Sequence, residues 1–135
     1  MLPKNCALTL ALLCVCTACT NIAADCRNQV LEELASPSGK MKAVIFQRDC
    51  GATTGFSTQI SVLSKDEKLP EEGGNVFVAD TNRGEAPSGQ GGGPVVEASW
   101  VSENELLIKH DARARTFQHE QSLGNVRILY ETFTK

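Results

Sequence analysis

Alternation of apolar and polar residues is the clearest pattern in this chain. Along 56–63 (FSTQISVL) every second residue, namely Phe56, Thr58, Ile60 and Val62, falls on one face, and the polar Ser57, Gln59 and Ser61 fall on the other. This pattern predicts a strand with one buried and one exposed face. Along 41–48 (MKAVIFQR) the residues from Ala43 to Phe46 are all apolar, which predicts a strand buried on both faces. Both stretches therefore indicate a β-sheet.

Further strands extend this pattern toward the C-terminus. Stretches rich in β-branched and aromatic residues, bounded by turn residues, predict strands at 75–79, 95–101, 105–110 and 125–132. The Ser-Pro-Ser-Gly sequence at 36–39 predicts a tight turn. Two segments each fit two structures: 28–35 is a short helix or a strand, and 112–120 is an edge strand or a helical turn.

These elements predict a mainly β fold, because no long amphipathic helix separates the strands. We expect a single small antiparallel sheet or sandwich of about six to seven strands, with at most one short N-terminal helix. The aromatic residues fall almost entirely in the predicted strands, so we expect them in the core.

Residues 80–94 (DTNRGEAPSGQGGGP) form the most unusual stretch. They contain five glycines and two prolines but few apolar side chains, which predicts a long, exposed and mobile loop. Its three consecutive glycines lack the lysine and the following helix of a phosphate-binding loop. We therefore expect this loop to be dispensable for folding and to contribute to contact with a partner.

The N-terminal residues 1–24 have the pattern of a secretory signal peptide. Lys4 precedes an apolar stretch at 6–19 that is too short to span a bilayer. The remaining residues, 25–135, are predicted to form a single β-rich domain. A chain of this length is large enough to bury one core.

Two cleavage sites fit this signal. Thr17-Ala18-Cys19 resembles the end of a bacterial lipobox, although Cys16 stands where leucine is usual. We favour cleavage before Cys19, whose thiol would then carry a lipid; the alternative is cleavage after Ala24, which would release the domain unlipidated. A lipidated chain would be anchored in the membrane by its acyl groups.

Cysteine positions predict one disulfide bond. Three of the six cysteines leave with the signal, and Cys19 is either lipidated or removed. Cys26 and Cys50 then remain in an oxidising compartment, where a pair of cysteines is expected to be bonded. No metal site is predicted, because two thiols and two separate histidines do not make a ligand set.

Charge and composition narrow the possible functions. The net charge is −3 at pH 7 and the basic residues form no stripe, so we expect no nucleic acid as partner. His110 lies beside Asp111 and His119 beside Glu120, but histidines at strand ends are usually solvated or capping groups. We therefore predict no catalytic residues and no cofactor.

The loop at 49–55 is the best candidate for binding. It places Asp49, Thr53 and Thr54 among small residues next to the predicted disulfide. Short polar side chains on a loop that is held by a covalent bond can form a recognition surface.

Several stretches together resemble a known group of sequences. They are SPSGK at 36–40, DCGATTGFST at 49–58, GNVFVAD at 74–80 and the segment that ends in Trp100. The chain resembles a family of small exported bacterial proteins, often lipoproteins, that has no assigned function. The resemblance implies export and a domain covering most of the mature chain, but no chemistry.

We therefore expect a non-enzymatic binding or accessory lipoprotein of the bacterial cell envelope. Its expected partners are the membrane, through the N-terminal lipid, and an envelope protein. We favour the periplasmic face of the outer membrane, and the alternative is a freely periplasmic form. Two other functions fit the sequence: a small envelope hydrolase with an unrecognised site, and an inhibitor or immunity protein.

Overall fold

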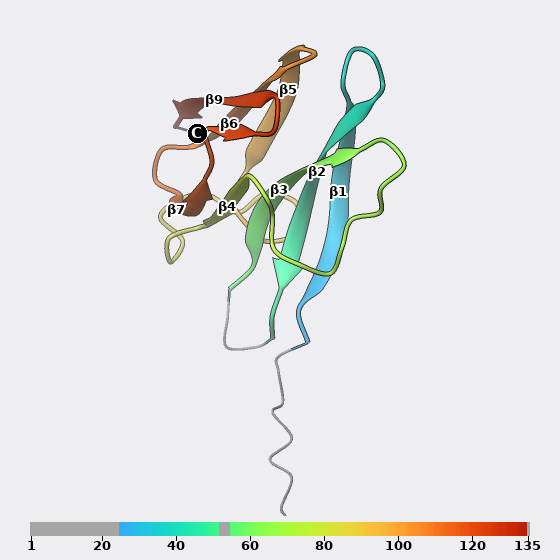
Figure 1. Cartoon of the computed structure of the whole chain (residues 1–135). Coiled ribbons are helices and arrows are strands. Elements are labelled where there is room, and N and C mark those ends of the chain that lie inside the picture. The colour runs from blue at the N-terminus through green and yellow to red at the C-terminus, as the bar shows by residue number, and fades with distance from the viewer. Residues whose placement is uncertain (1–24, 52–54, 135) are drawn as a thin grey trace, which may run out of the picture.

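The computed structural model describes residues 25–51 and 55–134, and they form two β-sheets (Figure 1). The predicted signal segment and Cys19 lie outside the described residues. The first sheet has the order β1-β2-β3-β4-β7, with strands β1 (Arg27–Ala35), β2 (Met41–Asp49), β3 (Ser57–Ser64), β4 (Phe77–Asp80) and β7 (Arg115–His119). The second has the order β5-β6-β9-β8, with strands β5 (Val96–Ser102), β6 (Glu105–Asp111), β9 (Val126–Phe133) and β8 (Ser122–Leu123).

The predicted mainly β fold is confirmed, with two differences. The described residues form nine strands instead of six or seven. Both segments that fitted two structures contain strands, at 27–35 and 115–119, and the short β8 was not predicted. In addition, β6 and β9 pair in parallel, whereas the other strand pairs are antiparallel. A parallel pair needs a crossover connection. Here the chain leaves β6, adds β7 to the other sheet and returns through β8 to β9.

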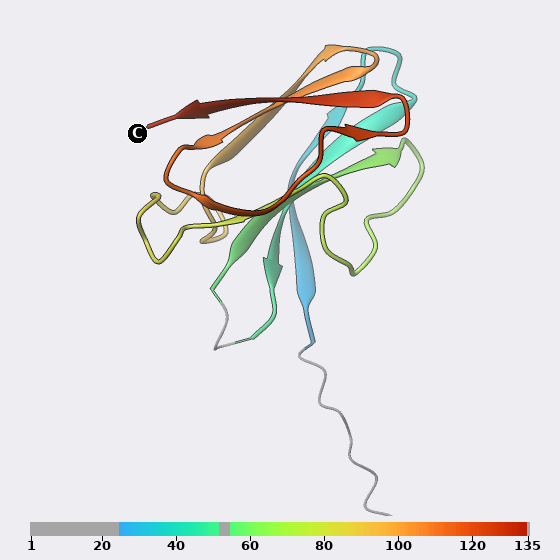
Figure 2. The same cartoon turned by 60° about the vertical axis from the view of Figure 1, so that its left-hand side comes forward.

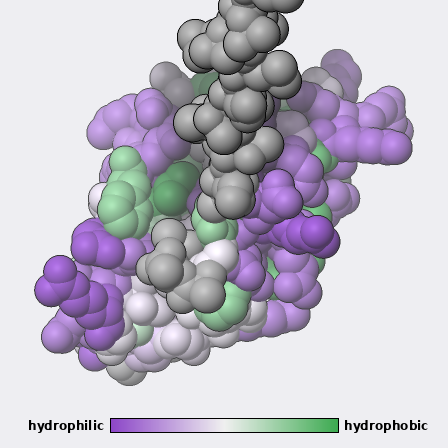
Figure 3. All heavy atoms as spheres, turned by 90° about the horizontal axis from the view of Figure 1, so that it is seen from below, coloured by the Kyte–Doolittle hydropathy of each residue, from purple (hydrophilic) through white to green (hydrophobic). Residues whose placement is uncertain are grey.

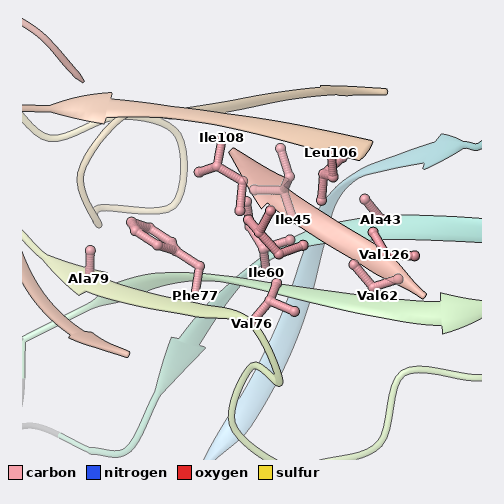
Figure 4. Packing of buried hydrophobic residues seen from close by; sticks show 11 residues of the cluster. Ala43, Ile45, Ile60, Val62, Val76, Phe77, Ala79, Leu106, Ile108 and Val126 are labelled. Atoms are coloured by element: carbon pink, nitrogen blue, oxygen red, sulfur yellow. The ribbon is translucent and has the colours of Figure 1, made fainter. Parts of the chain in front are cut away.

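The hydrophobic core lies between the two sheets (Figure 4). The first sheet and the turn before β4 contribute Ala43, Ile45, Ile60, Val62, Val76, Phe77 and Ala79, and the second contributes Leu106, Ile108, Val126 and Ile128. Trp100 packs against this cluster, and its indole N–H donates a hydrogen bond to the Leu34 carbonyl 2.9 Å away, which ties β5 to β1. No helix in the described part of the chain is long and apolar enough to cross a membrane.

The outer face of the first sheet, which points away from the second sheet, is also covered in its upper part. Apolar side chains of Val44, Phe46 and Leu63 pack there with Leu69 from the β3–β4 connection. The polar residues of β3 are buried as well, and the Gln59 side-chain oxygen accepts a hydrogen bond from the Gly74 amide 2.7 Å away. The prediction of an exposed polar face for 56–63 is therefore wrong.

The lower ends of β1, β2 and β3 extend beyond the second sheet (Figure 2). We call this region, which contains Cys26 and Cys50, the disulfide end. Its inner face is covered by the second half of the glycine-rich segment 80–94. The Thr58 hydroxyl donates a 2.8 Å hydrogen bond to the Pro94 carbonyl, and both residues are buried.

The prediction that all of 80–94 is an exposed loop is therefore wrong. Residues 83–85 are exposed, but Ala86, Gly93 and Pro94 are buried. The physical reason is the lack of side chains: a Cβ atom on Gly93 would lie 2.4 Å from the Thr58 hydroxyl oxygen and 2.7 Å from its amide nitrogen. Glycine thus lets the backbone lie directly on the sheet and complete the core where the second sheet ends.

Candidate functional site

The disulfide end is fixed by the bond predicted from the sequence. Cys26 and Cys50 are bonded, with their Cα atoms 4.0 Å apart, directly beyond the last paired residues of β1 and β2. Of the predicted binding loop, Thr53 and Thr54 lie outside the described residues. The Asp49 carboxylate accepts a 3.0 Å hydrogen bond from the Gly51 amide, so it stabilises the start of the turn after β2.

A row of polar residues crosses the outer face of the first sheet at the disulfide end. Each member lies directly opposite the next in the strand ladder, and the row runs Asn28, Arg48, Ser57, Asp80, Arg115. We call it the outer-face row. It takes one residue from each of the five strands, so that residues up to 87 positions apart in the sequence, from 28 to 115, become neighbours. No local pattern in the sequence predicts this row.

A hollow of about 400 Å³ lies beside this row. It is lined by Arg48, Cys50, Gly55, Ser57, Val78, Asp80, Arg115 and Phe117. Two aromatic side chains that we had expected in the core are exposed at this end, Phe56 by 45% and Phe117 by 61%. Figure 3 shows separate hydrophobic patches among hydrophilic residues on this end of the molecule.

The exposure of Phe117 has a structural cause. In the ladder between β4 and β7, Val78 pairs with Gln118 and Ala79 with Thr116, which leaves Phe117 as the extra residue of a β-bulge. A bulge turns one side chain away from the regular alternation. The aromatic ring is thereby placed at the hollow on the outer face rather than in the core.

Arg115 joins Phe117 to the outer-face row. Its guanidinium carbon lies 4.9 Å from the centre of the Phe117 ring, and its Nε donates a 3.2 Å hydrogen bond to the Asp80 carboxylate. Burial raises the pKa of Asp80, but the hydrogen bonds from Arg115 and the Asn82 amide, together with the Arg115 charge, outweigh it and leave this pKa below its usual range. Asp80 therefore stays ionised and positions Arg115 over the ring.

Arg48 is held differently. Its NH1 group donates a 2.7 Å hydrogen bond to the Asn28 side-chain oxygen. The Asn28 side-chain nitrogen in turn donates to the carbonyls of Pro70, at 2.9 Å, and Glu72, at 2.8 Å. Among the described residues no carboxylate forms an ion pair with Arg48. The row therefore carries two arginines and one aspartate.

The two histidines lie elsewhere, on the inner side of the sandwich. The His119 ring stacks on Tyr130 with 3.4 Å between ring centres, and the His110 ring centre is 5.2 Å from that of Phe77. His110 is only 6% exposed. The expectation that both are solvated or capping groups is therefore wrong for His110, which is buried. It holds for His119, which is exposed although its ring packs on Tyr130.

The acidic neighbours of the histidines have other partners. The Asp111 carboxylate accepts hydrogen bonds from Nε and NH2 of Arg113, at 2.9 and 2.8 Å. Tyr130 donates a 2.6 Å hydrogen bond to the backbone carbonyl of Glu120. The adjacent pairs seen in the sequence thus serve packing in this fold. Within the described residues, no group of three histidine, cysteine, aspartate or glutamate side chains could hold a metal ion.

Acid should destabilise the domain through His119. Burial, and then the charge of His110, lower the pKa of His119 below its ordinary value of 6.5. The unfolded chain takes up this proton near pH 6.5 but the folded chain does not, so this stability is complete above that pH and is lost as the pH falls through the folded pKa. We expect the melting temperature to fall between about pH 7.5 and 5, and His119→Phe, which keeps a ring against Tyr130, to reduce that fall. Identical pH profiles for both proteins would contradict this assignment.

Comparison with known proteins identifies no relative of this chain: no family model, no curated protein and no solved structure matches it.

Proposed function

We propose that this domain is a non-enzymatic binding module of the bacterial cell envelope, and that it contacts a protein partner through the hollow beside the outer-face row. The observation that carries the proposal is Phe117, which is 61% exposed although it lies in a strand, with Arg115 against its ring. Aromatic residues and arginine are enriched at protein interfaces, where a few such side chains contribute most of the binding energy.

The rigidity of the surroundings supports the same proposal. Arg115 is held by Asp80, Arg48 by Asn28, and the disulfide closes the adjacent end of β1 and β2. Side chains that are already fixed lose little entropy when a partner binds. The exposed ring is thus presented in one orientation by a surface that needs little rearrangement.

The predicted lipid anchor would determine which way this surface faces. If Cys19 carries the lipid, the six residues from Thr20 to Asp25 separate the lipid from the domain. Even a fully extended chain of this length spans at most about 20 Å. The disulfide end would therefore lie next to the membrane, and the partner of the hollow would be a membrane protein or another protein held close to the bilayer.

Isolation of cross-linked partner proteins from cell-envelope preparations tests this function. We expect cross-linking of the full-length tagged protein to recover a partner, and Phe117→Ala to reduce recovery roughly tenfold, as for an interface hot spot. The matched control is Val101→Ala, because Val101 is similarly exposed, at 57%, but lies on β5 of the other sheet. In Cys19→Ser the protein should leave the membrane fraction. Equal recovery with Phe117→Ala and Val101→Ala would overturn the assignment of this surface.

A further inference from the structure

The geometry of the outer-face row points to the chemistry of the ligand. We infer that the hollow binds an extended peptide segment of the partner, with a carboxylate on Arg48 and an apolar side chain against Phe117. This inference rests on the proposed function, since it names the kind of segment that the binding surface would recognise.

The first argument is the state of Arg48. Arg113, Arg115 and Arg127 each form an ion pair with a carboxylate, whereas Arg48 is half-buried and has no ion pair among the described residues. The nearby Glu71 carboxylate is not the partner of Arg48 either, since it accepts a hydrogen bond from the backbone N–H group of Asn28. A partly desolvated guanidinium without an anion is costly, and an incoming carboxylate would remove that cost.

The second argument is preorganisation. Asn28 fixes one edge of the Arg48 guanidinium by its 2.7 Å hydrogen bond and is itself held by two backbone carbonyls. A guanidinium carries five N–H donors in a planar fork, so donors remain after this one bond. Their planar arrangement matches a carboxylate, which can accept two parallel hydrogen bonds.

The third argument is the distribution of charge along the hollow. Asp80 lies between the two arginines in the row, and its negative charge disfavours a ligand with several adjacent anionic groups, such as a polyphosphate. A ligand with one carboxylate at Arg48 avoids this repulsion. Beyond Ser57, the hollow is lined by Val78 and Phe117, which favour an apolar group at that end.

The dimensions of the row give the length of the ligand. Arg48 and Arg115 are three strand positions apart, on β2 and β7, which corresponds to about 14 Å at the usual spacing of strands. About four residues of an extended chain cover this distance. A tetrapeptide with an acidic residue at one end and an aromatic residue at the other therefore fits the proposed site.

Titration with defined peptides tests the inference. The probes are blocked tetrapeptides with glutamate at one end and phenylalanine at the other, in both chain directions, and their glutamine analogues. Binding to the full-length protein in detergent micelles is followed by the NMR signal of the Arg48 Nε–H group and by the amide signals. We expect a glutamate peptide of one direction to bind at least about tenfold more tightly than its glutamine analogue, as for a charge-assisted bidentate pair.

Variants separate recognition from stability. Arg48→Gln should abolish the preference for glutamate, and Arg48→Lys should retain only part of it because a lysine cannot donate as a fork. The matched control is Arg27→Gln, which removes an exposed arginine from the same end of the molecule and should leave the preference intact. Melting temperatures of all variants show whether a loss of binding reflects unfolding.

Several outcomes would overturn the inference. Equal affinity for the glutamate and glutamine peptides would do so, as would an equal loss in Arg27→Gln. Inorganic phosphate that competes as well as the glutamate peptide would indicate a general anion site, and Arg48-dependent binding to phosphatidylglycerol vesicles without peptide discrimination would indicate a lipid surface. Envelope capture that depends on Phe117 but not on Arg48 would leave the proposed function in place and remove only this inference.

Discussion

Replacement of Gly93 by alanine should destabilise the domain by about 3 kcal/mol or more, because the added methyl group has no room. Its Cβ atom would lie 2.4 Å from the Thr58 hydroxyl oxygen, 2.7 Å from the Thr58 amide nitrogen and 2.8 Å from the Ser57 carbonyl carbon. Two of these three atoms belong to the backbone of β3, which cannot move without breaking its pairing with β2 and β4. Urea denaturation of both proteins measures the difference.

Gly55→Ala provides the control for this variant. Nothing lies within 4 Å of a Cβ atom at Gly55, so alanine should leave the midpoint of unfolding nearly unchanged. Gly84→Ala adds a second comparison, because the position is open but has a φ of +85°, which isolates the cost of backbone strain. A Gly93→Ala protein as stable as the wild type would show that the glycine-rich segment does not pack on β3.

This packing changes the role that we predicted for residues 80–94. Glycines and prolines without apolar side chains usually indicate a loop that is free of the core. Here the glycines serve close contact instead: a Cβ atom on Gly91 would meet the Gln47 side chain at 2.8 Å, and one on Gly92 would meet the Phe56 ring at 2.6 Å. Shortening 84–92 should therefore cost stability, and only the exposed residues of the segment, 83–85, 87–88 and 90, remain available for contact with a partner.

The strands were largely predictable because their signals are local. Each side chain of a strand alternates between two faces, and the apolar runs at 41–48 and 56–63 lie in β2 and β3 as predicted. The disulfide was predictable because export leaves Cys26 and Cys50 as a pair, and they are bonded. What the pattern of one strand does not contain is the segment that covers its second face, which here comes from the β3–β4 connection.

The candidate site was not predictable for a related reason. The outer-face row exists only once five strands are in register, and register depends on pairings between distant segments. Phe117 has an aromatic side chain of the kind that usually lies in a core, and a single bulge between β4 and β7 places it at the surface. The small and polar residues at 49–55 predicted a binding loop there. Arg48, directly before this loop, stands in an ordinary strand sequence that predicts no binding role.

Removal of the Cys26–Cys50 disulfide should have the other large effect on stability. The bond joins residues 24 positions apart, and closing a loop of this size contributes about 3.5 kcal/mol in the chain-entropy account, chiefly by restricting the unfolded chain. We expect the double variant Cys26→Ser, Cys50→Ser to lose about this much free energy of unfolding in urea. The wild type in a reducing agent should show the same loss, which controls for the serine side chains.

The disulfide prediction also tests how the site is held together. Arg27 pairs with Asp49, and Asn28 pairs with Arg48, in the first rungs of the ladder next to the bond. If the bond acts mainly on the unfolded chain, the folded double variant should keep the Asn28–Arg48 contact, and the Arg48 Nε–H signal should be unchanged at a temperature well below unfolding. A shifted or broadened signal in a folded variant would instead show that the covalent bond holds the lower ends of β1 and β2 in place. A loss below about 1 kcal/mol, with the signal unchanged, would contradict the stabilising role itself.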